Sequence, residues 1–165
     1  AYVGAVDIES LKGCAAANRT KKSRLCVHRN IDEPLHEMLI VHANDTYVRP
    51  HKHFGKSESF HLIEGRLRVV LFEDDGSIRT VVDMGPYQEG EQFYYRLSEP
   101  LFHTVVVLSD WVVFHEVTDG PFRREDTVFA PWAPAESDTQ SVREYMDMLV
   151  RESSGNARFP ACVCT

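Results

Sequence analysis

The sequence predicts an all-β fold, a double-sheet jelly roll or small barrel with a short helix near each end. Two observations carry this prediction. Short segments rich in β-branched and aromatic side chains recur at even spacing, and clusters of turn residues separate them. Many short strands at such spacing are typical of sandwiches and barrels. No internal repeat or second domain is visible, so a single β-domain is expected.

The chain opens with a predicted helix. Asp7 is a candidate N-cap for a helix that runs through about Asn18, because its side chain can accept hydrogen bonds from free backbone N–H groups of the first turn. Ile8, Leu11 and Ala15 would then share one side of this helix. We expect it to act as a lid over the β-domain or to lie at a dimer interface.

From Arg24 onward the pattern changes to that of β-strands. At least eight strands are expected, over Leu35–His42, Thr46–His53, Ser57–Glu64, Arg66–Glu73, Ile78–Met84, Glu91–Leu97, His103–Leu108 and Trp111–Thr118. Asp74-Asp75-Gly76 would form a turn. Ser109-Asp110 would join the last two strands as a tight hairpin.

The region after the strands is of two kinds. Residues 120–138 contain three prolines and Trp132 but no periodicity, which predicts an ordered wrapping loop whose tryptophan caps a cavity or anchors the loop. Ser141 to Glu152 predicts an amphipathic helix that covers one sheet or a partner subunit. The apolar residues at helical spacing in this segment are Val142, Tyr145, Met146 and Leu149.

These elements divide the chain into three parts. Residues 1–23 would form a helical extension, residues 24–136 the β-domain with its wrapping loop, and residues 137–165 a helix and tail. The chain has 165 residues and is 43% hydrophobic, so it can bury a core without disulfides or a structural metal.

Charge and hydropathy exclude several classes of partner. The chain has 18 Lys and Arg against 25 Asp and Glu, for a net charge of −7, and no basic run is longer than Lys21-Lys22. Neither nucleic acid nor an anionic membrane is therefore an expected partner, and an anionic substrate would need local arginines. No apolar stretch approaches the ~20 residues of a membrane span, and no signal pattern opens the chain. The expected location is the cytoplasm.

The four cysteines do not suggest a framework. Cys14, Cys26, Cys162 and Cys164 include no Cys-x-x-Cys pair, and their uneven spacing fits neither disulfides nor a zinc knuckle. We expect free thiols in a reducing compartment, and no metal role for Cys162 and Cys164.

A cluster of metal-ligand residue types is the most informative feature of the chain. His51 and His53 are one residue apart, Glu58 follows five positions later, and His103 lies 45 residues beyond it. In an extended segment alternate side chains share a face, so the two histidines would project together, about 6–7 Å apart at ~3.3 Å per residue. Gly55 gives the intervening segment the freedom to reverse and to bring Glu58 back as an oxygen ligand on the next strand.

Three neutral nitrogens and one carboxylate suit a divalent first-row metal. An octahedral ion would keep coordination positions open for water or substrate. We therefore expect one divalent ion per chain, held by His51, His53, Glu58 and His103. Iron, zinc, nickel and manganese all remain open, because such ligands tolerate each of them.

At these residues the chain resembles the cupin superfamily. The first cupin motif runs His-x-His, three or four residues, Glu, six residues, Gly, and His51, His53, Glu58 and Gly65 fit it without a gap. In the second motif His103 matches, whereas the Pro, Gly and Asn positions do not. The resemblance implies the double-stranded β-helix, or cupin jelly roll, with the ligands pointing into its mouth.

Residues 24–136 also resemble the WbuC-type cupin-fold metalloproteins. The resemblance rests on four strings, Arg24-Leu25-Cys26-Val27-His28-Arg29, Tyr47-Val48-Arg49-Pro50-His51, Gly120-Pro121-Phe122 and Phe129-Ala130-Pro131-Trp132-Ala133-Pro134-Ala135-Glu136. It implies a small soluble bacterial metalloprotein, in a family associated with surface-polysaccharide biosynthesis.

Two side chains are weak candidates for catalysis. Arg49 shares strand parity with His51 and could hold a phosphate or carboxylate of a substrate in the cavity, or it could lie on the solvent side of the rim. Glu116 could be a general base or an ordinary rim carboxylate. The other histidines are not expected to be ligands, and these are His28, His36, His42, His61 and His115.

Three functions are compatible with this site. The first is a metal-dependent isomerase, epimerase or lyase acting on a sugar or sugar nucleotide. The second is an iron-dependent dioxygenase, and the third is a non-catalytic, metal-dependent binding or sensor module. A small-molecule ligand is expected in each case. A homodimer is also expected, because long strand edges prefer to be covered.

Overall fold

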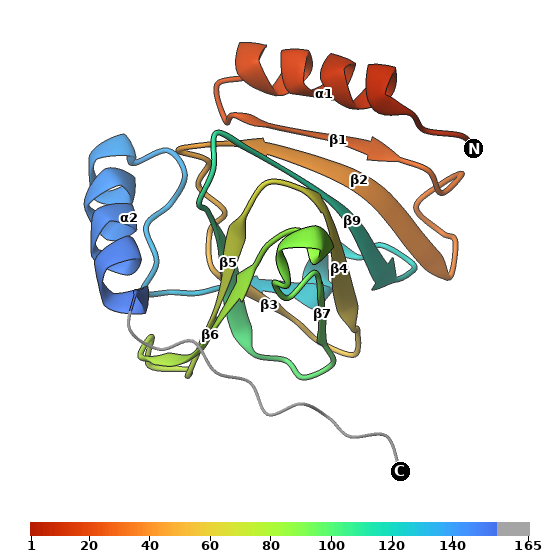
Figure 1. Ribbon diagram of the computed structural model, residues 1–165. Helices are drawn as coiled ribbons and strands as arrows, with labels where there is room; N and C mark the ends of the chain where they lie inside the picture. Colours follow the sequence, from red (N-terminus) through yellow and green to blue (C-terminus); the bar gives the residue numbers. More distant parts are fainter. Residues whose placement is uncertain (155–165) are drawn as a thin grey trace.

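The computed structural model describes residues 1–154, whose strands form two five-stranded sheets that face each other (Figure 1). The first sheet has the order β1-β2-β9-β4-β7 and the second β10-β3-β8-β5-β6, and every pairing between these strands is antiparallel. The strands are β1 (Lys22–Cys26), β2 (Leu35–Ala43), β3 (His51–His53), β4 (Glu58–Glu64), β5 (Leu67–Phe72), β6 (Ile78–Met84), β7 (Tyr94–Leu97), β8 (Phe102–Val107), β9 (Trp111–Asp119) and β10 (Thr127–Phe129). The helices are α1 (Ala5–Ala17) and α2 (Thr139–Ser153), with short 3-10 turns at Tyr87–Glu89 and Arg124–Asp126. The predicted all-β double-sheet fold with a helix near each end is confirmed.

The main core lies between the sheets, because alternate side chains of each strand point inward. On β4 these are Phe60 and Leu62, and on β9 Val112 and Phe114. Strands β5 and β8 are buried on both faces, since α2 and the wrapping loop cover the outside of their sheet. That second cluster consists of Val70, Phe72, Val81, Phe102, Val106, Ala130, Ala133 and Leu149.

The predicted N-terminal helix is present, but its cap differs from the prediction. Gly4 is the N-cap, and Asp7 lies three residues further on, where its carboxylate accepts a hydrogen bond of 2.8 Å from the Gly4 N–H. Asp7 thus supplies the far half of a capping box instead of the cap itself. Ala15 is buried against Val41 and Val113, so α1 packs on the outer face of the first sheet (Figure 1).

The predicted hairpin at Ser109-Asp110 is wrong. Strand β8 pairs with β3 and β5, whereas β9 pairs with β2 and β4, so these two residues carry the chain from one sheet to the other. Ser109 stabilises the crossing, because its hydroxyl accepts a hydrogen bond from the Arg66 N–H and donates one to the Trp111 carbonyl. Two turn residues between two strands do not reveal whether those strands are neighbours.

The segment before the His-x-His pair contains less strand than predicted. Only His51–His53 of the expected Thr46–His53 strand enters a sheet, and Pro50 has no N–H group to donate to a ladder. The structure adds a strand, β10, that the sequence did not reveal, within the expected wrapping loop. It pairs with β3 in the register Thr127↔His53 and Phe129↔His51.

The rest of the wrapping loop is anchored by its tryptophan. The ring of Trp132 packs 5.0 Å from that of Phe72 and 5.8 Å from that of Phe102, and its N–H donates to the Asp74 carbonyl. The predicted C-terminal helix is confirmed as α2, with Asp138 as its N-cap. Cys14 and Cys26 are free thiols, and Cys162 and Cys164 lie outside the described residues. None of the helices in residues 1–154 is long and apolar enough to cross a membrane.

Gly65 is expected to be essential for the β4–β5 connection. Its φ is +79°, and a Cβ atom there would lie 2.0 Å from the Trp111 carbonyl oxygen. Gly65→Ala should therefore lower the free energy of unfolding by about 3 kcal/mol, measured by urea denaturation. Gly90→Ala is the matched control, since Gly90 has a φ of +75° with open space around it, and should cost only about 1–2 kcal/mol. Equal losses in the two variants would contradict the proposed clash.

His42 should make stability depend on pH. It is 7% exposed, and burial lowers the pKa of its imidazole to about 4, with a further contribution from Lys22. The unfolded chain binds this proton more readily than the folded chain does. The contribution of neutral His42 to the free energy of unfolding is therefore complete above about pH 6.5 and is lost as the pH falls toward 4. Between pH 7 and pH 5 the loss should be about 2 kcal/mol. Urea unfolding of a His42→Leu variant should show a pH dependence smaller by that amount, and an unchanged dependence would refute this role.

Candidate metal centre

The candidate ligands lie between the two sheets, and strand register determines how they meet. His51 and His53 are the first and last residues of β3, and His103 on β8 lies directly opposite His51. Glu58 is the first residue of β4, in the facing sheet. The structure therefore brings together residues that are up to 52 positions apart in the sequence.

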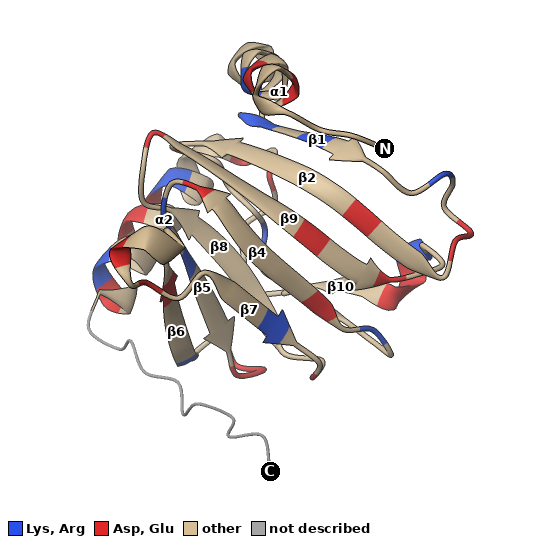
Figure 2. Ribbon diagram, turned by 45° about the vertical axis from the view of Figure 1, so that its right-hand side comes forward, with Lys and Arg blue, Asp and Glu red and all other residues tan. Residues whose placement is uncertain are grey.

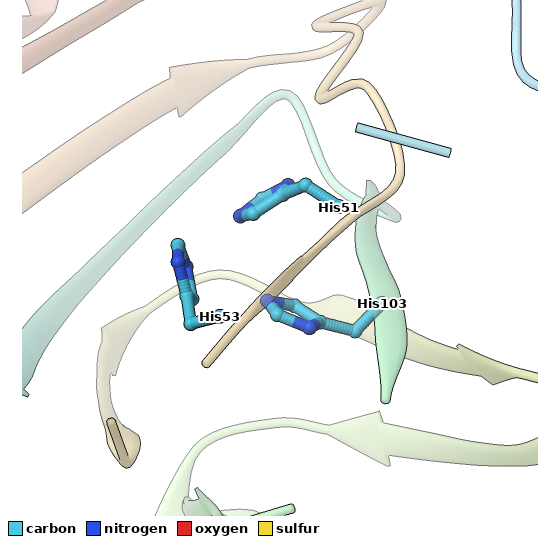
Figure 3. Close-up of side chains that lie close together, drawn as sticks. All are labelled: His51, His53 and His103. Atoms are coloured by element: carbon cyan, nitrogen blue, oxygen red, sulfur yellow. The ribbon is translucent and has the colours of Figure 1, made fainter. Parts of the chain in front are cut away.

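The three histidines converge on one point (Figure 3). Each offers a ring nitrogen, and these three atoms lie within 4.8 Å of one another, as expected for a group that can hold a metal ion. The carboxylate of Glu58 is beside two of them. Its Oε1 lies 2.7 Å from Nε2 of His103, and its Oε2 lies 3.7 Å from Nε2 of His53.

Backbone carbonyls set the orientation of two of these rings. Nδ1 of His51 lies 2.8 Å from the Arg49 carbonyl oxygen, and Nδ1 of His103 lies 3.0 Å from that of Leu101. A carbonyl only accepts hydrogen bonds, so in a neutral ring the proton is assigned to Nδ1 and the lone pair of Nε2 faces the centre. Nδ1 of His53 contacts the Thr127 hydroxyl at 3.0 Å. Such outer contacts are typical of metal-ligating histidines.

The contact between His103 and Glu58 needs a positive charge, either a proton on the imidazole or a bound cation. Nε2 of His103 and Oε1 of Glu58 are both acceptors in this arrangement, both are buried, and neither has a hydrogen-bond donor among the described residues. Two lone pairs at 2.7 Å repel each other unless a proton or a cation accompanies them. The donor set of three imidazoles and one carboxylate fits a divalent first-row metal.

The protonation states also fit metal binding. Burial, with a smaller effect of the neighbouring His103, lowers the pKa of His51 to about 4, so this ring is neutral near pH 7. Burial likewise lowers the pKa of His53. Burial opposes a charge on His103, but the Glu58 carboxylate outweighs it and raises the pKa of that ring. A metal ion would compete with this proton for the same pair of atoms.

The ligands line one side of a cavity of about 380 Å³ between the sheets. Glu116 on β9 lies in the same cavity and pairs with Phe60 on β4. Glu58 pairs with Thr118, two residues further along β9, so the two carboxyl groups lie on neighbouring strands. Burial and the charge of Glu58 raise the pKa of Glu116 to about 8, against smaller opposing effects of His103 and Arg24. Burial and the neighbouring carboxylate therefore favour the protonated form of this carboxyl group.

Arg49, the other candidate for catalysis, lies outside the group of residues that line this cavity. Its guanidinium donates to the Ala130 carbonyl at 3.2 Å and lies 5.2 Å from the centre of the Phe129 ring. The parity argument did not apply, because strict alternation holds only within a strand and β3 begins at His51.

The histidines that were not expected to be ligands occupy two environments. His61 is exposed and faces away from the centre, and His115 lies 3.5 Å from Glu37. His28, His36 and His42 line the cavity without joining the three converging rings. The sequence contained a signal that His36 and His42 face inward, since they alternate along β2 with the same parity as the buried Met38 and Ile40.

A second, larger cavity of about 730 Å³ lies between α2 and the outer side of β8. Its floor includes Val106, Val142 and Met146. None of the three converging histidines lines it, so the smaller cavity is the candidate site.

Comparisons with known proteins agree with the fold. Residues 4–84 match the model of a family described as a domain of unknown function (DUF6016). Comparison with curated proteins finds no match. Among solved structures, protein SO0799 from Shewanella oneidensis is similar with a TM-score of 0.56 and 9% identity, over 82% of this chain and 85% of that chain.

Two further structures share the architecture. An uncharacterized Klebsiella pneumoniae protein with a double-stranded β-helix domain has a TM-score of 0.52 and 10% identity, over 68% of this chain and 82% of that chain. The DMSP lyase DddQ from Ruegeria pomeroyi has a TM-score of 0.52 and 11% identity, over 70% of this chain and 54% of that chain, so this chain spans about half of its length. At these identities the likeness concerns the fold alone. The chain thus has the double-stranded β-helix fold of the cupins, with a histidine group that can hold a metal.

Proposed function

We propose that the protein is a metal-dependent enzyme that moves a proton on a small polar metabolite, in an isomerase, epimerase or lyase reaction. Glu116 is the observation that carries this proposal. It places a carboxyl group with a pKa near 8 in the same cavity as three converging histidines and Glu58. Groups whose pKa lies near the operating pH are the efficient general acids and bases.

Each residue has a role in this proposal. His51, His53, His103 and Glu58 hold one divalent ion, whose identity we leave among iron, zinc, nickel and manganese. When bound, such an ion supplies Lewis-acid polarisation of a carbonyl or hydroxyl oxygen. Glu116 accepts a proton from the substrate carbon or donates one to it. The apolar side chains of Phe60 and Phe114 limit water on that side of the cavity.

Glu116 favours proton transfer over the two alternatives. The cavity lining is mixed, since apolar side chains such as Met38, Phe60 and Phe114 lie beside Glu116 and the basic residues Arg24, Lys56 and Arg123. An iron-dependent dioxygenase would leave Glu116 without a role as a proton carrier. A non-catalytic binding or sensor module needs no acid or base within reach of its ligand. The position of Glu116 therefore supports catalysis.

The substrate class in this proposal follows from the resemblance of residues 24–136. The WbuC-type resemblance suggests a sugar or sugar nucleotide of bacterial surface-polysaccharide metabolism. The DMSP lyase DddQ shares the fold, and it illustrates that this scaffold supports lyase chemistry.

The metal site is tested by elemental analysis of protein purified without chelator. We expect about one equivalent of a divalent metal in the parent and its loss in a His51→Ala, His53→Ala double variant, because two of the converging nitrogens are removed. His61→Ala removes an exposed histidine outside the cavity and should keep the metal. Metal retained at the parent level in the double variant would show that these histidines are not the ligands.

The reaction class is tested by deuterium exchange. Metal-loaded protein is incubated in D₂O with a panel of sugars, sugar phosphates and hydroxy acids, and NMR measures the exchange of carbon-bound hydrogen. We expect exchange in at least one compound and a loss of 10²-fold or more in Glu116→Gln, with the metal content unchanged, because the proton carrier is removed. The control is Glu37→Gln, since Glu37 lies on β2 outside the cavity lining.

Two results would contradict the proposal. One is full exchange activity in Glu116→Gln. The other is oxygen consumption by the iron-loaded protein with no hydrogen exchange in the whole panel, which would support the dioxygenase instead.

A further inference from the structure

We propose that the mouth of the cavity binds an anionic oxygen group of the substrate, a carboxylate or a phosphate, through Arg24 and Arg123. This inference deepens the proposed function, on which it rests only in placing this ligand in the same cavity as the metal. It names a site that is separate from the metal ligands. Three features carry it: the register of Arg24, the anchoring of the Arg123 loop, and the charges around the mouth.

Arg24 faces the cavity because of its register in the first sheet. It lies opposite Ile40 on β2, and Ile40 lies opposite the buried Phe114 on β9, so the three share the inward face. The Arg24 side chain is an exposed part of the cavity lining. Its positive charge also acts on Glu116, deeper in the cavity. There it lowers the pKa of the carboxyl group, against the larger effect of burial, which raises that pKa.

Arg123 is brought to the cavity by a loop with little freedom to move. The N–H of Phe122 donates to the Ile31 carbonyl at 2.8 Å, and that of Gly120 donates to the Pro34 carbonyl at 3.0 Å. A Cβ atom on Gly120 would lie 1.8 Å from the Glu33 carbonyl oxygen. The loop is therefore packed closely against the segment between β1 and β2, and Arg123 projects from a fixed support.

A buried imidazole in the same cavity lacks a partner. His36 is 4% exposed, and its Nε2 has no hydrogen-bond partner among residues 1–154. Its ring stacks on His28 with centroids 4.1 Å apart and planes 6° apart, so its orientation is fixed. Buried polar atoms are normally paired. This nitrogen lies beside Gly120, where a Cβ atom would be 2.9 Å from it, so the His28–His36 pair forms a packed wall of the cavity next to the Arg123 loop.

Two of the charged side chains around the mouth are already paired, whereas the two arginines are not. Asp119 is already engaged, since its carboxylate accepts hydrogen bonds of 2.8 Å from the N–H and the hydroxyl of Ser57. Lys56 is engaged as well, with Asp126 at 3.3 Å and the Pro121 carbonyl at 2.5 Å. By contrast, neither Arg24 nor Arg123 has a carboxylate oxygen within 4.0 Å in the described part of the chain.

Two arginines without a carboxylate partner among residues 1–154 are a local exception in an acidic chain. The net charge is −7, and Figure 2 shows basic positions on β1 and beside β10 among many acidic ones. Guanidinium groups match the geometry of carboxylates and phosphates and can bind them through paired hydrogen bonds. A substrate with such a group at one end would have its other end directed into the cavity, toward Glu116 and the histidines.

The test is a titration of the purified protein with inorganic phosphate and, separately, with acetate. NMR follows the Nε–Hε signals of the arginines, and calorimetry gives the dissociation constants. We expect saturable shifts at Arg24 and Arg123, and affinity at least tenfold weaker in the Arg24→Gln, Arg123→Gln double variant with metal content unchanged. Arg29→Gln is the control, because Arg29 is exposed and is not part of the cavity lining. Tighter binding of phosphate indicates a phosphorylated substrate, and tighter binding of acetate a carboxylate.

A second arm separates this site from the metal. The His51→Ala, His53→Ala variant should still bind phosphate or acetate with shifts at both arginines. If anion binding disappears in that variant and is unchanged in the arginine double variant, the metal alone holds the anion and the inference is overturned. Absence of binding by both anions in the parent also overturns it. Anion binding at the arginines in a parent that contains no metal would retain this site and refute the metal-dependent function.

Discussion

The pairing of β3 with β8 is the contact on which the candidate site depends. It sets His51 directly opposite His103, and the carbonyls of Arg49 and Leu101 orient the two rings so that the remaining nitrogens face inward. The facing sheet then supplies Glu58 at a distance of 2.7 Å from His103. Because one sheet provides the nitrogens and the other the carboxylate, the site forms only when the two sheets close on each other.

The sequence was a good guide to local features and a poor one to pairing between distant strands. The spacing of His51, His53 and Glu58 predicted residues that do meet, because alternation within a strand and a short reversal are local properties. It could not reveal that Ser109-Asp110 crosses between sheets, since that depends on partners far away in the chain. Strand β10 was missed because three residues show no periodicity. Strand parity left the side of Arg49 open, because the strand begins after it.

The family match illustrates the same division. Residues 4–84 contain His51, His53 and Glu58, whereas His103 and Glu116 lie beyond this range. Strand pairing brings these two later residues into the cavity. A relative that is identified through the first half alone therefore does not necessarily carry the complete site. The inward positions on β8 and β9 are the ones to compare.

Strand β3 is weakly tied to the framework, although it carries two of the candidate ligands. It has three residues, and a single residue pair joins it to β8, while its other neighbour is the equally short β10. Short elements with few cross-strand bonds are where local opening begins. An ion bound by residues of β3, β8 and β4 would cross-link the two sheets beside the cavity. Metal occupancy would thereby control how often the two sheets open locally beside the cavity, and with it the entry of ligands.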